Sequence, residues 1–313
     1  MNQWLTRIDW LYYGILYKLF PKNQFGIKQH WVDRREVNSE IRRMILTNES
    51  FMACRFGWTE LSAMKAYEFK RSKNKRIHCM KNLCLASGFF PEVEEYGWRF
   101  LKLMQACCKD IDFLRKMDAP YENYFIRKYM RKNVTITGDI MEPWCLDNPW
   151  SVALEGKKVL VVHPFHKTIQ QQYGKRELLF GDSPILPDFH LITYKSVQTM
   201  GNEVDSRFSD WFAALNFMIN EIKNIDFDIA IVGCGAYGLP LASAIKRMGR
   251  QAIHMGGATQ VLFGIKGQRW LDDANVVNII NESWVWPLDE ETPRSAADID
   301  GGYFKSGTYP PRF

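Results

Sequence analysis

No segment of the 313-residue sequence approaches the roughly 18 consecutive apolar residues that a membrane-spanning helix needs. The mean hydropathy of −0.29 agrees, which excludes a transmembrane protein, and a hydrophobic content of 46% excludes a disordered chain. The first residues lack a basic stretch followed by an apolar run and a small-residue cleavage site. We therefore expect no secretory signal and a retained N-terminus.

Signals for cysteine pairing are also missing. The seven cysteines form no C-x-x-C pair and are odd in number, which excludes both a disulfide framework and a zinc cage. We expect reduced thiols and a cytoplasmic protein. The 41 Lys and Arg against 35 Asp and Glu leave a net charge of +6. This balance favours anionic ligands such as phosphates or acidic lipid, and it falls short of the charge density of a nucleic-acid-binding protein.

The beginning of the chain has the pattern of an amphipathic helix that ends near Pro21. Apolar residues recur every three or four positions and basic residues flank them: Trp4, Ile8, Leu11, Ile15 and Leu19, with Arg7, Lys18 and Lys22. Two interpretations stay open. The helix lies in the headgroup region of an anionic leaflet, which would make the protein peripheral at the inner membrane, or it packs on the domain or on a second subunit. We treat residues 1–35 as an N-terminal extension and residues 36–313 as one domain.

Short apolar segments alternate with helical patterns along that domain. Strands are predicted at 50–57, 157–165, 189–197, 226–233 and 250–257, and helices at 59–71, 91–117, 209–225 and 239–249. Short strands that are apolar throughout are typical of a mostly parallel sheet with helices on both faces, which is a Rossmann-like α/β fold. Ligands bind such sheets beyond the carboxyl ends of the strands. The residues that follow each strand are therefore the candidate site residues.

The sequence G-C-G-A-Y-G follows one of these strands and opens a helix, with Gly233, Gly235, Tyr237 and Gly238. It matches the dinucleotide fingerprint, in which glycines permit a tight turn and the close approach of a phosphate. A nicotinamide or flavin site also needs an acid about 20 residues further on, where this chain has His254. The turn is predicted to contact a nucleotide or its diphosphate. Tight strand-to-helix packing is the alternative.

A second strand end carries the sequence Arg55-Phe56-Gly57-Trp58-Thr59-Glu60. The Arg55 guanidinium is suited to bind phosphate, and the Glu60 carboxylate is suited to act as a base or to bind a metal ion. The alternative is an Arg55–Glu60 ion pair, with Glu60 favoured in the first turn of a helix by the helix dipole.

Further polar side chains follow the strands at 157–165 and 250–257: His163, His166, His254, Gln260, Lys266 and Arg269. Neutral imidazoles and an amide suit hydrogen bonds to a donor or an acceptor. Zinc ligation by the first two histidines lacks a nearby cysteine or acid that would complete a tetrahedral set. The two cations suit a pyrophosphate, with solvated charges as the alternative.

The RFGWTE element resembles the RFG-D-G-E element of bacterial glycosyltransferases with the GT-D fold, in which a D-x-E carboxylate pair helps to bind a divalent metal and a nucleotide sugar. The segment IAIVGCGAYGLPLASAIKRMGRQAIHMGG is similar to their strand, glycine turn, helix and strand unit, and the likeness extends loosely over residues 36–280. Arg55 and Gly57 match this element and Glu60 takes the place of the second carboxylate. Trp58 stands where the first carboxylate would be.

The resemblance implies a nucleotide-sugar-dependent glycosyltransferase that moves a sugar, first of all from a UDP-sugar, to a bacterial cell-surface glycan or a lipid-linked acceptor. It implies that Glu60 and His254 are catalytic and that Trp58 stacks on a sugar ring. Mg²⁺ or Mn²⁺ would bind at Glu60 if the diphosphate supplied further oxygens; otherwise cationic side chains neutralise the leaving group. Two other classes stay open, which are a nicotinamide-dependent oxidoreductase and a non-catalytic scaffold of a polysaccharide assembly complex.

Overall fold

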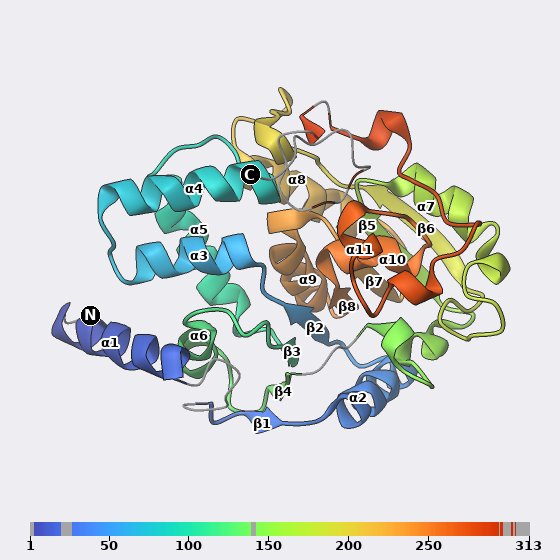
Figure 1. Cartoon of the computed structure of the whole chain (residues 1–313), viewed down its shortest axis with the longest axis horizontal. Helices are drawn as coiled ribbons and strands as arrows, with labels where there is room; N and C mark the ends of the chain where they lie inside the picture. Colours follow the sequence, from blue (N-terminus) through green and yellow to red (C-terminus); the bar gives the residue numbers. More distant parts are fainter. Residues whose placement is uncertain are drawn as a thin grey trace.

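The structure is a computed structural model that describes residues 3–19, 27–138, 142–293, 295–296, 302 and 304, with side chains from residue 8 onward. Eight strands in these residues form one sheet in the order β1-β4-β3-β2-β8-β7-β5-β6, and each neighbouring pair is parallel (Figure 1). The strands are β1 (His30–Trp31), β2 (Met52–Arg55), β3 (Phe113–Arg115), β4 (Thr135–Thr137), β5 (Lys158–His163), β6 (His190–Lys195), β7 (Ile229–Val232) and β8 (Gln251–His254).

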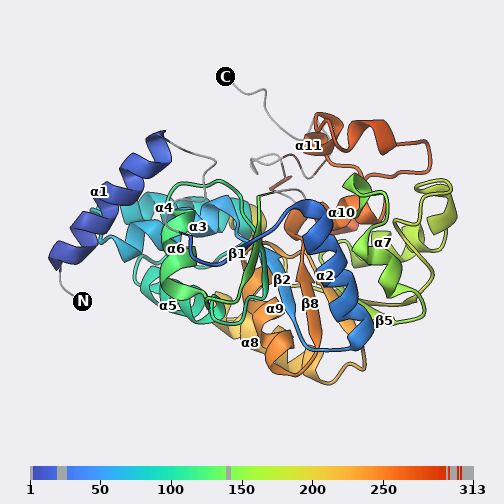
Figure 2. The same ribbon diagram turned by 90° about the horizontal axis from the view of Figure 1, so that it is seen from below.

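Helices cover both faces of this sheet (Figures 1 and 2). One layer holds α3 (Trp58–Glu68), α4 (Lys73–Ser87), α5 (Tyr96–Cys107), α6 (Glu122–Tyr129), α8 (Trp211–Lys223) and α9 (Gly238–Arg247). The other holds α2 (Arg34–Thr47), α7 (His166–Tyr173), α10 (Thr259–Leu262) and α11 (Gln268–Leu271). The remaining helix, α1 (Gln3–Leu19), lies outside the first layer. The predicted Rossmann-like fold is confirmed.

The two cores follow from the period of two along each strand. Met52 and Cys54 of β2 belong to the core under α3–α6, α8 and α9, whereas Ala53 between them belongs to the core under α2, α7 and α10. In β5, Leu160 and Val161 divide in the same way. Because successive side chains of a strand point to opposite faces, a strand buried on both faces is apolar throughout, which is the pattern that the sequence shows.

Two predictions from the pattern differ from the structure. The helix expected over 91–117 is the shorter α5, and β3 follows it at Phe113–Arg115, because a three-residue buried strand cannot be told from one turn of a buried helix by its apolar residues. The extension at 1–35 also contains β1, which pairs with β4. The sheet therefore begins at His30, before residue 36.

The predicted N-terminal helix is present as α1. Pro21 and Lys22 lie outside the described residues, as do the side chains of Trp4 and Arg7. None of the helices in the described part of the chain combines the length and the apolar character needed to cross a bilayer.

All seven cysteines are free thiols. Six of them are buried, and burial raises the pKa of Cys107 to about 11 and that of Cys84 to about 12. These thiols therefore stay protonated and unreactive near neutral pH.

Candidate functional site

A cavity of about 210 Å³ opens at the carboxyl ends of β2, β5, β7 and β8, where a parallel sheet is expected to bind its ligand. Eleven of the predicted site residues line it: Arg55, Gly57, Trp58, Glu60, His163, Gly233, Gly235, Tyr237, His254, Gln260 and Arg269. Three others, Gly238, His166 and Lys266, do not line it. The sheet thus brings strand ends that are far apart in the sequence to one place.

The Glu60 carboxylate lies in the first turn of α3 and is 8% exposed. Its Oε2 accepts a hydrogen bond from the Thr59 hydroxyl at 2.8 Å, and the Thr59 and Ser87 hydroxyl oxygens are 2.5 Å apart. A Cβ atom on Gly57 would lie 1.9 Å from Glu60 Oε2. The carboxylate therefore folds back over Gly57 at the beginning of α3, where the helix dipole stabilises a negative charge.

Two arginines bring positive charge to the same cavity. A Cβ atom on Gly256, which has a φ of +61°, would lie 3.5 Å from Arg55 Nε, so the end of β2 lies against the turn that follows β8. Arg269 lines the cavity from α11, and its guanidinium lies 4.7 Å from the centre of the Trp270 ring. Glu60 is the one acid among the described lining residues. The cavity consequently favours an anionic ligand.

Both lining histidines are neutral. His254 Nδ1 lies 3.1 Å from the Val232 carbonyl oxygen, which only accepts, so Nδ1 carries the proton and Nε2 is an acceptor. Burial, together with the positive charge of Arg55, lowers the pKa of His254 to about 4. His163 Nδ1 accepts from the Phe165 amide at 3.0 Å, and burial lowers its pKa to about 3. Neither ring contributes a positive charge at neutral pH.

The glycine turn is packed against protein on three sides. A Cβ atom would lie 2.5 Å from Thr259 Oγ1 at Gly233, 2.5 Å from the Ser87 carbonyl oxygen at Gly235, and 2.1 Å from the His254 ring at Gly238. Close packing alone is therefore enough to explain why each of these positions is glycine. This is the tight strand-to-helix packing that the sequence left open as the alternative to phosphate contact. Gly233 and Gly235 still present backbone to the cavity.

Trp58 differs from the other lining aromatic residues because its side chain is 51% exposed. It stands at the start of α3, next to Gly57. An exposed ring at the rim of the cavity offers a flat apolar surface to a ligand.

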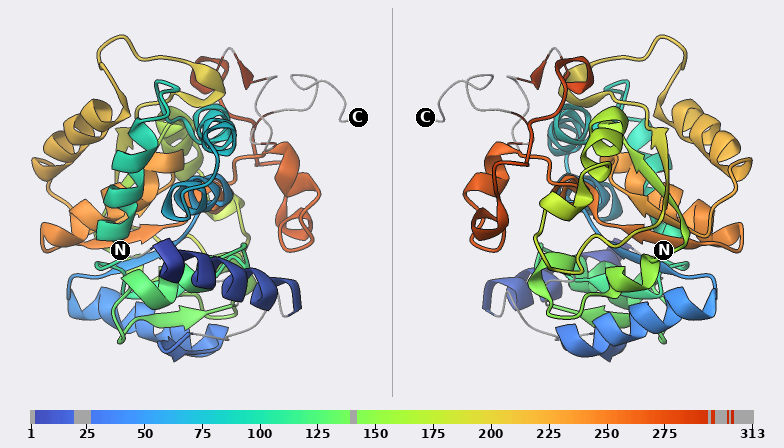
Figure 3. Two further views of the ribbon diagram at one scale, coloured as in Figure 1. Left: turned by 90° about the vertical axis from the view of Figure 1, so that its left-hand side faces the viewer. Right: turned by 90° about the vertical axis from the view of Figure 1, so that its right-hand side faces the viewer.

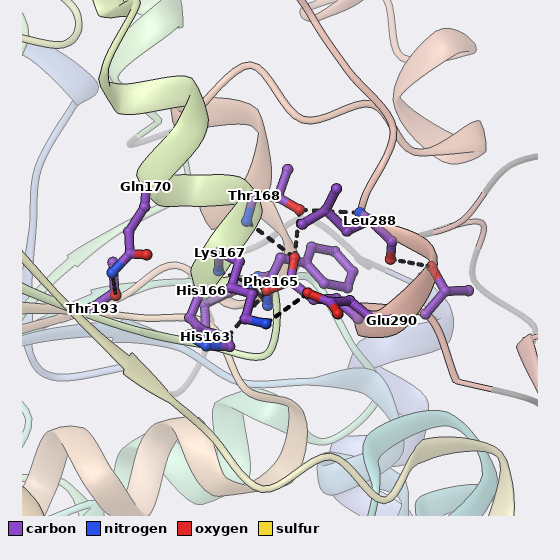
Figure 4. Close-up of polar contacts among 11 residues, drawn as sticks. His163, Phe165, His166, Lys167, Thr168, Gln170, Thr193, Leu288 and Glu290 are labelled. Carbon is purple, nitrogen blue, oxygen red and sulfur yellow. Dashed lines mark hydrogen bonds and ion pairs between the residues drawn. The ribbon is translucent and has the colours of Figure 1, made fainter.

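His166 serves another purpose, which Figure 4 shows. Its Nδ1 lies 3.1 Å from Glu291 Oε1, and Glu291 also accepts from the backbone amides of Lys167 and Thr168 at 2.7 and 3.1 Å. The Lys167 ammonium pairs with Glu290 at 2.8 Å. These contacts cap the beginning of α7 and attach the chain around residue 290 to it. His166 therefore contacts Glu291 and does not line the cavity, although it is only three positions beyond His163.

Sequence reasoning missed the lining residues that come from loops and helix ends. Ser87 and Gly88 end α4, and the Thr199 hydroxyl donates to the Gly88 carbonyl oxygen at 2.6 Å. Ser196 and Gln198 each carry a buried polar atom without a hydrogen bond in the described structure, namely Oγ and Nε2. No strand pattern precedes α4, so only tertiary contact marks Ser87 as a site residue.

The described residues do not supply a ligand set for a metal at Glu60. The one group of three side chains among them with suitable spacing is His30, Glu36 and Glu40, and none of these lines the cavity. His163 and His166 belong to no such group either. Any ion bound at Glu60 would therefore take most of its ligands from a diphosphate and water.

A second cavity, of about 560 Å³, adjoins the first and shares Pro164, Ser196, Val197 and Gln198 with it. Its other lining residues are mostly charged or aromatic: Tyr194, Lys195, Glu203, Asp205, Arg207, Phe217, Glu221, Glu290, Glu291, Thr292 and Pro293. The two cavities thus meet at the loop that follows β6.

No protein-family profile and no curated protein matches the chain. Two solved structures of the domain of unknown function 1792 are similar to it. One, a selenomethionine-substituted form, is 12% identical with a TM-score of 0.42, over 74% of this chain and 80% of that one. The other is described as having a distinct glycosyltransferase fold. It is 12% identical with a TM-score of 0.45, over 87% of this chain and 96% of that one. At this identity the likeness concerns the fold alone.

Proposed function

We propose that this protein is a glycosyltransferase that uses a nucleotide diphosphate sugar, first of all a UDP-sugar, at the cavity on the carboxyl edge of the sheet. The acceptor is a growing bacterial cell-surface glycan or a lipid-linked saccharide, reached at the cytoplasmic side of the membrane. One observation carries this proposal: a single cavity combines two guanidinium groups, a buried carboxylate and two neutral imidazoles, from four separate parts of the chain.

Each of these groups has a role in such a transfer. Arg55 and Arg269 bind the diphosphate and offset the negative charge that grows on it as the bond to the sugar breaks. Glu60 accepts the proton of the attacking acceptor hydroxyl, with its orientation held by the Thr59 hydroxyl. His254 presents Nε2 as a hydrogen-bond acceptor to a sugar hydroxyl, because Nδ1 is occupied by Val232.

The adjoining cavity offers a place for the acceptor. Its carboxylates and the rings of Tyr194 and Phe217 are the groups with which proteins bind the hydroxyls and the apolar faces of sugars. The buried Ser196 hydroxyl and the Gln198 amide lie where the two cavities meet. A ligand hydroxyl there would satisfy polar atoms that are otherwise costly to bury. Trp58 stacks on a sugar ring at the rim.

Thermal unfolding with a panel of nucleotides and nucleotide sugars, each with and without Mn²⁺, tests the proposal. A ligand at a hundredfold excess over its Kd stabilises a protein by about 2.7 kcal/mol, so the true donor raises the Tm. Stabilisation by nicotinamide dinucleotides alone would instead indicate an oxidoreductase. Binding of a nucleotide sugar without hydrolysis or transfer would indicate a scaffold. No stabilisation by any member of the panel refutes the proposed site.

A further inference from the structure

The outward face of α1 is a continuous aliphatic stripe. Its members follow at intervals of three, four and four residues, which places them on one side of a helix. Their exposed fractions are 58% for Ile8, 57% for Leu11, 55% for Ile15 and 65% for Leu19. Figures 2 and 3 show α1 on the outside of the molecule, with its length along the surface. Four adjacent aliphatic side chains held in water are unfavourable and mark an interaction surface.

The opposite face of α1 is held firmly by aromatic packing. Trp10 stacks on Tyr121 with ring centres 4.4 Å apart, and the Tyr121 hydroxyl donates to the Trp10 carbonyl oxygen at 3.1 Å. Tyr13 is 5% exposed and packs edge-on against Tyr124. Rotation of the helix to bury the stripe would break all these contacts. The outward direction of the stripe is therefore fixed by the packing of α1 on α6 and the loop before it.

A basic segment lies next to this helix. Residues 69–91 contain no acidic residue. The turn after α3 exposes Lys70 and Arg71, and the first turn of α4 exposes Lys73 and Lys75. The Arg71 guanidinium lies 4.3 Å from the centre of the Trp10 ring in α1. This contact places the basic segment directly beside the helix that carries the aliphatic stripe.

We propose that the aliphatic stripe of α1 and the basic segment 70–75 together bind the surface of an anionic phospholipid bilayer. The aliphatic side chains enter the boundary between headgroups and acyl chains, and the cations lie against the lipid phosphates. A second copy of the chain fits this surface less well, because a symmetric contact between two α1 helices would bring two basic segments together. The inference rests on the proposed function only for the choice of the bacterial cytoplasmic membrane.

Sedimentation of the full chain with vesicles tests this surface. We expect binding to phosphatidylcholine–phosphatidylglycerol vesicles, weaker binding at high salt, and little binding to phosphatidylcholine alone. The double variant Leu11→Ser/Ile15→Ser should lose binding by about tenfold or more. The double variant Lys73→Gln/Lys75→Gln should bind anionic vesicles more weakly than the unmodified chain, and the difference should be largest at low salt, where charges are least screened. Leu46→Ser is the matched control, because Leu46 is an aliphatic residue of α2, 60% exposed, on the other side of the sheet.

Two results would overturn this inference. One is equal or absent binding of the unmodified chain to both kinds of vesicle. The other is a dimer without vesicles that Leu11→Ser/Ile15→Ser dissociates. If Leu11→Ser/Ile15→Ser does not fold, the inference is tested instead by the vesicle binding of Lys73→Gln/Lys75→Gln and by the salt dependence of binding of the unmodified chain. Transfer to a soluble acceptor, measured on the same preparations, separates the two proposals. Vesicle binding without transfer refutes the enzyme, and transfer without vesicle binding refutes the surface.

Discussion

Replacement of Glu60 by glutamine separates a catalytic carboxylate from a structural one. Glutamine keeps the size of the side chain and can still accept from Thr59, which lies 2.8 Å away, but it removes the charge that accepts a proton. If Glu60 is the base of the transfer, turnover should fall by roughly 10² or more. Because Glu60 lines the cavity, we expect the substitution to lower turnover and to leave the fraction of folded protein nearly unchanged.

The structure also sets the expected change in stability. Loss of a charge in the first turn of α3 costs about 0.3 to 1 kcal/mol through the helix dipole. The weaker hydrogen bond from Thr59 costs about 1 kcal/mol more, as charge-assisted bonds exceed neutral ones by that amount. The sum of about 1 to 2 kcal/mol lowers the Tm by only a few degrees in a chain of this size.

Glu68 provides the matched control, because it is a second buried glutamate of α3 that does not line the cavity. It pairs with Lys128 at 2.7 Å and accepts from Tyr129 at 2.7 Å. Glu68→Gln should cost about 3 kcal/mol, because it removes the negative charge from a buried carboxylate that pairs with Lys128 and accepts from Tyr129. It should leave the turnover of the folded molecules unchanged.

Initial rates and melting curves on the same two purified variants give the answer. Catalysis by Glu60 predicts a crossed result, in which Glu60→Gln loses rate with little change in Tm and Glu68→Gln loses Tm with little change in rate. Near-normal transfer by Glu60→Gln would refute the role of Glu60 as base. It would also weaken the resemblance of the RFGWTE element to the GT-D glycosyltransferases, because Glu60 is the only carboxylate of that motif that this sequence retains.

Three further predictions follow from the lining of the cavity. Arg269→Met should weaken donor affinity in calorimetric titrations while Lys266→Met, outside the cavity, should not; equal effects would place the diphosphate elsewhere. Trp58→Ala should raise the KM for donor or acceptor with a Tm within about 1 °C of the parent, because the ring is half exposed. Burial lowers the pKa of His163 to about 3 and that of His254 to about 4, from 6.5 in the unfolded chain. The unfolded chain then binds more protons, so the free energy of unfolding in urea titrations should fall as the pH drops from 6.5 towards 4 and stay level above 6.5.

Much of the fold can be predicted from local sequence patterns. A buried parallel strand is apolar at nearly every position. This pattern can be recognised in strands that are long enough, namely β2, β5, β7 and β8. The site follows from the same reasoning, because residues directly after such strands reach one edge of the sheet. Arg55, Glu60, His163 and His254 were predicted on this basis, and all four line the cavity.

Other site residues depend on contacts between distant segments. Strand order places β8 beside β2, so Arg55 lies near His254 although nearly two hundred positions separate them in the sequence. Ser87 enters the cavity only because α4 ends there, with Thr199 bound to Gly88. Strands as short as β3 and β4 have too few residues for any period to be recognised.

The N-terminal helix shows most clearly what the sequence determines and what only the tertiary structure decides. Sequence periodicity determines that Ile8, Leu11 and Ile15 share one face of a helix, because the helical repeat alone fixes which side chains are neighbours. It does not determine whether that face is buried. The tertiary structure decides this, because the rings of Trp10 and Tyr13 on the other face find aromatic partners in α6 and the loop before it. Those aromatic contacts hold the helix in one orientation and leave the aliphatic stripe exposed.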